Sequence, residues 1–303
     1  MMVAVTVWFG LAVVASSQTL RFGVIGDSGT GDRHQLAVAS RMAEYGKQWE
    51  FVLMLGDNIY PDGNPADFDA KFKVPYKALH DAGVRFRATL GNHDQIHREA
   101  GFGCKQAQET TFGFENQQDE YRFQAGGKAA GKPLARFIAL NAERWRRPGE
   151  ATHCGLSTQD RSKQLKQWLE NSAEYHWNFV FVHNPLYSYV YHWLIPPFFN
   201  GHGSDKRLRA LLEPQFKDRV DVVFSGHDHF YQKIKPQGGI HYFVSGGAAK
   251  LRRGGNHGHK NVEKGARIRH FLDIELSASE LRYRAIDVNG TVFDRGTIAK
   301  GVR

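Results

Sequence analysis

Polar side chains that can bind a cation or move a proton follow short apolar runs at five places in this 303-residue chain. The motifs are GD, GDNIY, GNHD, VFVHNP and GHDH, and their candidate side chains are Asp27, Asp57, Tyr60, Asn92, His93, His183, His227 and His229. A buried carboxylate is costly unless it is paired or binds a metal. Carboxylate, phenol, amide and imidazole donors together suit iron, zinc or manganese. The sequence therefore predicts a cation-binding site where these apolar runs end.

Each motif alone has an ordinary structural explanation. Asp after Gly at the end of a strand is usually a capping residue in a turn, and Asn and His are common in loops. An HDH triplet also occurs in solvent-exposed loops, and a single tyrosine such as Tyr60 more often packs in a core. Five such motifs in succession, each at the end of a predicted strand, favour one shared site instead.

The elements that must position these side chains are short strands alternating with helices. Continuous apolar runs predict buried strands at 20–25, 51–55, 85–90, 135–140, 178–182, 220–225 and 240–245. Helical spacing predicts helices over about 32–45 and 204–216 and another that begins at Ser157, while the runs after 270 alternate as antiparallel strands do. This order indicates a layered α/β fold, in which the carboxyl ends of strands meet at a ligand crevice.

Composition is that of a globular domain, with 41% hydrophobic and 23% charged residues. We expect a single domain over 18–303, with an irregular excursion over the surface at about 97–134. Residues 1–17 carry no charge and end in small residues, so we predict a signal peptide, a secreted or periplasmic location and no membrane span in the mature chain. A retained N-terminal anchor is the alternative. In such a compartment Cys104 and Cys154 are expected to form a disulfide, with two free thiols as the alternative.

The formal net charge of +9 favours anionic ligands. The segment 250–260, KLRRGGNHGHK, is the most basic stretch, and we interpret it as a solvent-exposed loop. A rim that attracts phosphates is the alternative, whereas no stable nucleic-acid complex is expected because no aromatic residues are interleaved. The GDSGTGD segment lacks the Gly-Lys-Ser/Thr element of a nucleotide-binding loop.

The order of the five motifs resembles that of the metallophosphoesterase superfamily. Tyr60, three residues after Asp57, is similar to the tyrosine that distinguishes its purple acid phosphatase branch. The resemblance extends loosely over residues 20–290, and it implies a four-layer α/β/β/α sandwich of two mixed sheets. The GHDH motif is similar to that of the small mammalian-type enzymes, whereas HNPLYSYVYH is similar to the plant-type enzymes, so the natural substrate stays open.

Roles for individual residues follow from this resemblance. It implies that Asp27, Tyr60 and His229 hold a ferric ion. Asn92, His183 and His227 would hold a divalent iron, zinc or manganese ion. Asp57 would bridge the two ions, and Tyr60 as a phenolate would give a purple charge-transfer colour. It further implies that His93 protonates the leaving alcohol, and that His192, nine residues after His183, faces the substrate.

The resemblance implies an acid phosphatase that cleaves phosphate monoesters with a hydroxide activated by two metal ions, releasing inorganic phosphate. A phosphodiesterase or nucleotide-cleaving enzyme with the same two metal ions is the first alternative. A secreted module that binds metal or phosphate without catalysis is the second, and redox side chemistry of an iron pair could accompany hydrolysis.

Overall fold

The computed structural model describes residues 19–147, 161–190, 202–255 and 258–301. The predicted signal peptide, Cys154, Ser157 and His192 lie outside these described residues. Cys104, which is described, is disulfide-bonded.

The first sheet has the order β13-β12-β11-β1-β2-β3. Its parallel strands are β1 (Leu20–Ile25), β2 (Phe51–Met54) and β3 (Arg85–Ala88). The strands β11 (His270–Leu276), β12 (Glu280–Asp287) and β13 (Val292–Ala299) continue from β1 in antiparallel pairing. The sheet is therefore mixed, and the alternating C-terminal runs are the antiparallel strands that the sequence predicts.

The second sheet has the order β10-β8-β9-β7-β6-β5-β4. Its parallel strands are β5 (Lys132–Leu140), β6 (Trp177–Val182), β7 (Val222–Ser225) and β9 (Ile240–Ser245). The antiparallel strands β4 (Tyr121–Ala129), β8 (Tyr231–Gln237) and β10 (Val262–Ala266) lie toward its two edges. This sheet is also mixed.

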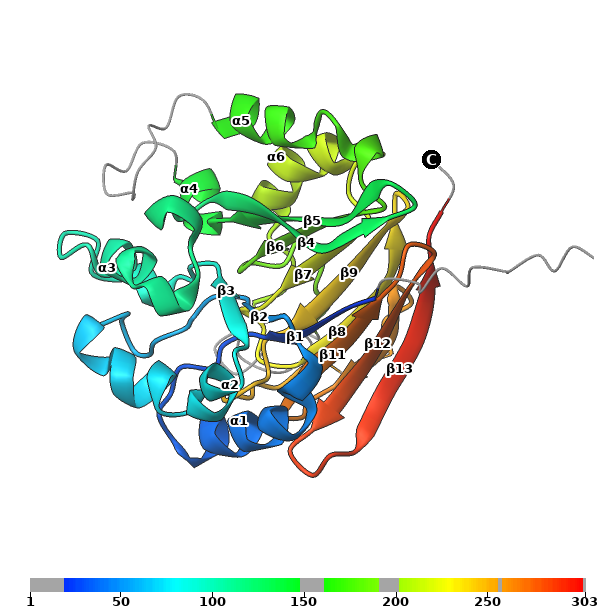
Figure 1. Cartoon of the computed structure of the whole chain (residues 1–303). Coiled ribbons are helices and arrows are strands. Elements are labelled where there is room, and N and C mark those ends of the chain that lie inside the picture. The colour runs from blue at the N-terminus through cyan, green and yellow to red at the C-terminus, as the bar shows by residue number, and fades with distance from the viewer. Residues whose placement is uncertain (1–18, 148–160, 191–201, 256–257, 302–303) are drawn as a thin grey trace, which may run out of the picture.

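Aromatic side chains fill the space between the two sheets. Phe22 and Phe51 of the first sheet each meet Phe137 of the second edge-on, with ring centroids 5.3 Å apart in both pairs. Phe137 also stacks on Phe179 at 4.6 Å. Such offset and edge-on contacts add to the free energy gained by burial. The sheets consequently pack face to face (Figure 1).

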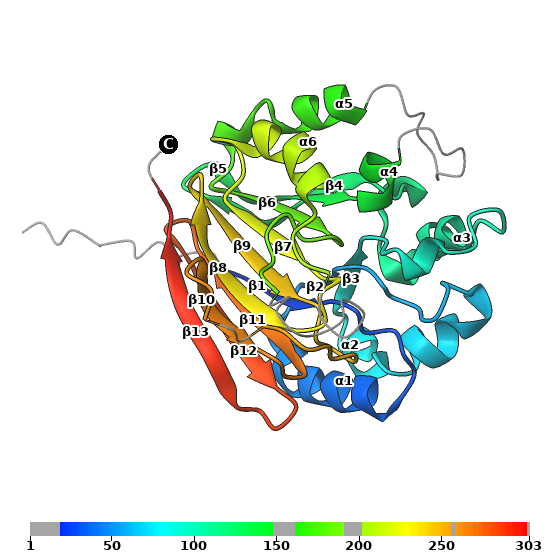
Figure 2. The ribbon, with the colours of Figure 1, turned by 180° about the vertical axis from the view of Figure 1, so that it is seen from behind.

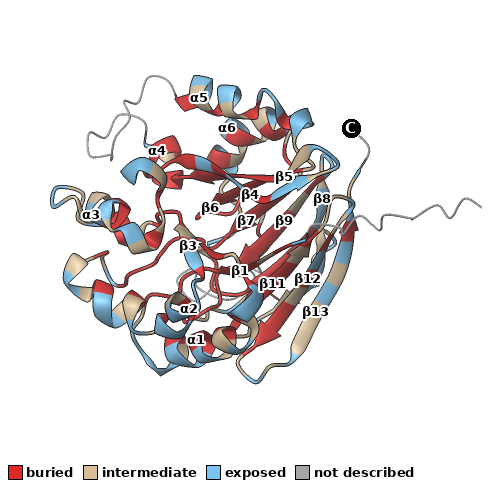
Figure 3. Cartoon of the chain, in the orientation of Figure 1, coloured by how far each residue is buried: buried red, intermediate tan, exposed pale blue. Residues whose placement is uncertain are grey.

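Helices cover the outer face of each sheet (Figure 2). The helices α1 (Arg33–Tyr45) and α2 (Lys77–Asp81) lie on the first sheet, and α4 (Ala142–Arg146), α5 (Arg161–Leu169) and α6 (Lys206–Phe216) lie on the second. Helix α1 begins where the sequence predicts, because the Asp32 carboxylate caps it by accepting from two backbone N–H groups. Buried residues line the strands and the inward faces of these helices (Figure 3). The predicted four-layer sandwich of two mixed sheets is confirmed.

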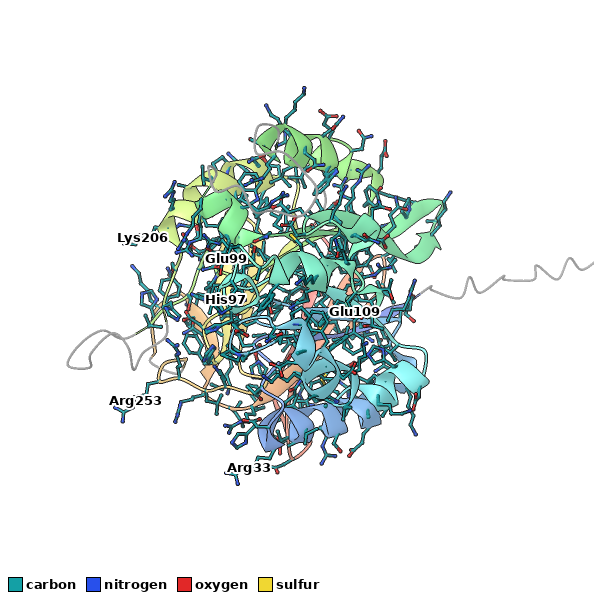
Figure 4. The ribbon with its side chains drawn as sticks, turned by 90° about the vertical axis from the view of Figure 1, so that its left-hand side faces the viewer. Arg33, His97, Glu99, Glu109, Lys206 and Arg253 are labelled. Carbon is teal, nitrogen blue, oxygen red and sulfur yellow. The ribbon has the colours of Figure 1, made fainter. Side chains whose placement is uncertain are left out.

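The segment 97–134 is more regular than predicted. It holds α3 (Phe102–Gln108) and strand β4, and its residues His97 and Glu99 lie close together in Figure 4, with Glu109 further away. The Gly-rich stretch 125–133 at the end of this excursion is the hairpin that joins β4 to β5. Gly126 and Gly127 have positive φ, and the pairing register shifts between Ala125 and Lys128. This bulge interrupts the alternation of apolar and polar residues that marks a strand, so the strand was missed.

Short turns of helix connect the larger elements. The 3-10 turns are Gly46–Gln48, Pro65–Asp67, His93–Gln95, Thr110–Phe112, Glu115–Gln117 and Ser172–Glu174, and Asp69–Lys73 is a π-turn. Among the described residues, we find no helix with both the length and the apolar character needed to cross a bilayer.

We expect Phe137→Ala to destabilise the protein by about 3–5 kcal/mol. The Phe137 ring contacts four other phenylalanine rings, so its removal leaves a cavity among them. Urea unfolding followed by circular dichroism measures this loss. Leu36→Ala, at a residue that is 46% exposed on α1, is the control and should change stability by less than about 0.5 kcal/mol. Equal effects of the two substitutions would contradict the assigned inter-sheet core.

Candidate metal centre

The structure brings the candidate side chains of both sheets together at one end of the sandwich. Asp27, Asp57 and Asn92 follow β1, β2 and β3 of the first sheet, whereas His183 and His227 follow β6 and β7 of the second. Asp27 and His183 have no exposed surface. Five strand ends therefore meet at the edge where the two sheets face each other.

Three of the donors form a nearly equilateral triangle. Tyr60 Oη lies 3.2 Å from Asp27 Oδ1 and 3.2 Å from His229 Nε2, and these two atoms are also 3.2 Å apart. Asp57 Oδ2 lies 2.8 Å from the same phenol oxygen. We call Asp27, Tyr60 and His229 the tyrosine cluster.

Three further donors gather around His183 Nε2, near the other oxygen of Asp57. His183 Nε2 lies 3.1 Å from Asn92 Oδ1, 3.1 Å from His227 Nδ1 and 3.4 Å from Asp57 Oδ1. His183 Nδ1 donates to the Leu55 carbonyl at 2.8 Å, which directs Nε2 toward the other donors. We call Asn92, His183 and His227 the histidine cluster.

The spacing of these donors suits two cations. Ligands at about 2.1 Å from a cation lie about 3 Å apart when they are at right angles, which is close to the separations in both clusters. The donor atoms of Asp27, Asp57 and His183 all lie within 4.8 Å of one another. Because each oxygen of Asp57 faces a different cluster, this carboxylate could bridge two ions.

The backbone at three of these residues is strained. Asp27, Asp57 and His227 have φ values of 58°, 52° and 67°, in the left-handed region that side chains with a Cβ disfavour. Two hydrogen bonds stabilise this geometry: His227 N donates to Asp27 Oδ2 at 2.8 Å, and His93 N donates to Asp57 Oδ1 at 2.9 Å. Strain of this kind concentrates at functional sites.

Two of the glycines in the motifs are required by close approach. A Cβ at Gly91 would lie 2.2 Å from Asp57 Oδ1, and one at Gly226 would lie 2.6 Å from Asp27 Oδ2. Both distances are too short for real atoms. The glycines therefore leave room for the two carboxylates as well as for the turn of the chain.

The electrostatic environment of both clusters favours the binding of cations. Burial, together with the Asp57 and Asp27 carboxylates, raises the pKa of Tyr60 well above its ordinary value. The Tyr60 phenol thus keeps its proton unless a bound cation takes the place of that proton. Burial, with the neighbouring His183, lowers the pKa of His227 well below its ordinary value, which keeps a ring nitrogen available as a ligand.

Asp94 and Asp228, which neighbour the candidate ligands in sequence, support the surrounding loops. Asp94 accepts hydrogen bonds from the backbone N–H groups of Asn58, Ile59 and Gly91, and burial raises its pKa to about 6. Asp228 accepts hydrogen bonds from Ser188 Oγ and from the backbone N–H groups of His202 and Gly203. The first carboxylate joins the loops after β2 and β3, and the second joins the loops after β6 and β7.

His93 lies beside the tyrosine cluster. Its ring centroid is 4.6 Å from that of Tyr60. Its Nδ1–H donates to the Pro61 carbonyl, so Nε2 is the nitrogen left for another partner. The other predicted catalytic residue, His192, lies outside the described residues.

Sequence reasoning missed two residues at this site. The His202 ring stacks on His227 with centroids 4.2 Å apart, and Lys250 Nζ lies 3.5 Å from the centroid of the Tyr60 ring. No motif marks His202. The basic character of 250–260 was a signal for Lys250, but it does not reveal which way the segment folds.

Solved structures of other proteins share the fold. The chain is similar to GAP50, the anchor in the inner membrane complex of Plasmodium, with a TM-score of 0.77 and 19% identity, covering 94% of this chain and 90% of that one. It is also similar to the purple acid phosphatase PPD1 from yellow lupin seeds, with a TM-score of 0.72 and 16% identity, covering 93% of this chain and 54% of that one.

Sequence comparison identifies the family. Residues 20–231, which contain all five motifs, match the calcineurin-like phosphoesterase family. The chain is 25% identical over 307 residues to purple acid phosphatase 7 of Arabidopsis thaliana, covering 94% of this chain and 88% of that relative. The chain therefore belongs to the calcineurin-like phosphoesterase family, as a phosphatase-type hydrolase similar to the purple acid phosphatases.

Proposed function

We propose that the protein hydrolyses phosphate monoesters at a pair of metal ions held by the tyrosine and histidine clusters. The observation that carries this proposal is that the two oxygens of Asp57 face separate donor sets, at 2.8 Å from Tyr60 Oη and 3.4 Å from His183 Nε2. Two ions bridged in this way would supply an activated water as nucleophile and neutralise charge on the phosphoryl oxygens.

The two clusters differ in chemistry, which favours two different ions. The tyrosine cluster offers a carboxylate, a phenol and one imidazole, and with Asp57 it can supply three anionic oxygens to one ion. We assign a ferric ion there. The histidine cluster offers an amide and two neutral imidazoles, which suit a divalent iron, zinc or manganese ion.

His93 is the residue we assign as general acid. Because Nδ1–H is held by the Pro61 carbonyl, the proton given to the leaving alcohol would come from Nε2 of the imidazolium form. The hydrogen bond from His93 N to Asp57 Oδ1 fixes the residue beside the bridging carboxylate. His192 is retained in the proposal as a second substrate-facing histidine.

Export of the protein is also part of the proposal. The uncharged, apolar N-terminal sequence supports a signal peptide, and the disulfide-bonded state of Cys104 suits an oxidising compartment.

The proposed reaction is tested by assaying the purified, metal-analysed protein with p-nitrophenyl phosphate and bis-p-nitrophenyl phosphate. We expect kcat/KM to be higher for the monoester. A preference for the diester would establish a phosphodiesterase instead, and two bound metals without turnover of either ester would establish a non-catalytic binding module.

Asp57→Ala should lower the content of both metals together, since this residue contributes one oxygen to each cluster. Elemental analysis of the purified protein measures the change. Asp69→Ala, at a carboxylate whose side chain is 80% exposed, is the matched control and should retain both metals. Loss of one metal only would disprove the bridging role.

Tyr60→Phe should abolish the visible charge-transfer absorption that we expect of the iron-loaded protein, because the replacement removes only the phenol oxygen. Tyr76→Phe removes the same atom from another buried tyrosine, outside both clusters, and should leave the spectrum unchanged. An absorption band that survives in Tyr60→Phe would show that this phenol is not the ligand.

His93→Ala should keep both metals but lower kcat by about 10²–10⁴-fold for an ester whose leaving group needs a proton, such as glycerol 2-phosphate. The loss should be much smaller for p-nitrophenyl phosphate, because its leaving group departs as a stable anion. A merely structural role would slow both substrates equally. His97→Ala, at an imidazole that is 46% exposed on the same segment, is the control.

A further inference from the structure

Cationic side chains from the start of the segment 250–260 lie against the candidate metal centre. The ammonium group of Lys250 lies over the ring of Tyr60, 3.5 Å from its centroid. Arg252 Nη1 lies 2.9 Å from Nε2 of His202, whose ring stacks on His227. The interpretation of this segment as a plain solvent-exposed loop is therefore wrong for Lys250 and Arg252. It remains adequate for Arg253, which is exposed and points outward in Figure 4.

The backbone of this segment is fixed to the loops that carry the candidate ligands. Ala248 N donates to the Gly26 carbonyl at 3.3 Å, next to Asp27. Arg252 N donates to the His229 carbonyl at 3.0 Å. Lys250 lies between these two attachments, and its position over Tyr60 is consequently set by the same loops that form the tyrosine cluster.

The two cations contact residues of different clusters and lie near enough to act on one another electrostatically. Lys250 contacts the ring of Tyr60, which belongs to the tyrosine cluster. Arg252 reaches His202, which covers His227 of the histidine cluster. Lys250 and Arg252, which we call the cationic pair, thus flank both halves of the centre.

Within the part of the chain that the structure describes, neither member of the cationic pair has a carboxylate at ion-pair distance, although Asp57 and Asp27 attract Lys250 from farther away. Some lysines elsewhere in the chain form such pairs, as Lys71 does with Asp67 at 2.8 Å and Lys77 with Asp81 at 2.6 Å. The cationic pair instead stands beside a site suited to two further cations. Such a concentration of positive charge is stabilised when an anion binds.

We propose that the cationic pair forms a subsite for a second phosphoryl group of the substrate, so that the enzyme prefers diphosphates over simple monoesters. The inference rests on the proposed function, since the reacting phosphoryl group is taken to lie between the tyrosine and histidine clusters. Arg252 offers a planar fork of donors and Lys250 a point charge, and both are common phosphate ligands. Arg267 Nε donates to the Arg252 carbonyl at 3.0 Å and adds a further positive charge beside the pair.

The proposal is tested by binding of two matched ligands that the enzyme cannot hydrolyse. Methylphosphonate presents one phosphoryl-like group, and methylenediphosphonate presents two. Isothermal titration calorimetry on the metal-loaded full-length protein gives both affinities, with metal content measured before and after each titration. Because no turnover is needed, a failure of the proposed catalytic function would leave this test intact.

We expect the wild-type protein to bind methylenediphosphonate more tightly than methylphosphonate. Lys250→Met and Arg252→Met should each weaken the diphosphonate about tenfold, the effect of losing one hydrogen bond to a charged group, and should change methylphosphonate by less than about twofold. Lys250→Arg, which keeps the charge, should restore most of the affinity. Lys128→Met is the control. Lys128 is exposed near the end of β4, where it pairs with the start of β5, and so it lies at the opposite end of the sheet from the site. This substitution should change neither affinity.

Two results would overturn the subsite. Equal weakening of both ligands would show that the cationic pair contacts the reacting phosphoryl group itself. Unchanged affinity for both ligands in Lys250→Met and Arg252→Met would show that the pair binds no phosphoryl group at all. Either result leaves the assignments of Asp57, Tyr60 and His93 to be judged by their own experiments.

Discussion

Two buried carboxylates that lie among imidazoles and a phenol are the constraint on which this structure depends. Asp27 and Asp57 are each at most 1% exposed, and both contact Tyr60, which itself carries no positive charge. Desolvating an ionised carboxylate costs several kcal/mol unless a cation or hydrogen bonds compensate for the lost water. Backbone N–H groups of His227 and His93 supply part of that compensation. Bound cations would supply the rest, in line with the dinuclear metal site expected of the calcineurin-like phosphoesterase family.

This arrangement requires both sheets at once. The tyrosine cluster takes Asp27 and Tyr60 from the first sheet but His229 from beyond β7 of the second, and the histidine cluster is divided in the same way. The distances between the two clusters and Asp57 therefore depend on how closely the sheets approach. The rings around Phe137 determine that approach, because close-packed interiors leave little room for adjustment. The inter-sheet core is thus part of the site, although it lies outside the coordination sphere.

The sequence was enough to predict which side chains gather at the ends of strands, but it did not reveal elements and contacts that depend on tertiary packing. Asp57 and His183 follow uninterrupted apolar runs, so their convergence could be expected from the period of the strands alone. Strand β4 was missed because a bulge at Gly126 breaks its alternation, and β8 because most of its residues, YQKIKPQ, are polar. Lys250 was assigned to solvent because a cation over an aromatic ring leaves no local sequence signal. Lys250 and Tyr60 are far apart in the sequence, so the sequence alone does not show that they are in contact.

Two aspartates that lie outside both clusters explain why the motifs extend beyond their candidate ligands. Asp94 and Asp228 turn away from the clusters and hold neighbouring loops through backbone N–H groups. Because these carboxylates hold the ligand loops from behind, the residues in front of the site are free to vary without displacing the ligands. Lys250 and His202 belong to that front layer, and they come from segments outside the five motifs. A fold of this kind can keep one metal chemistry constant while a separate layer of side chains selects the phosphoester.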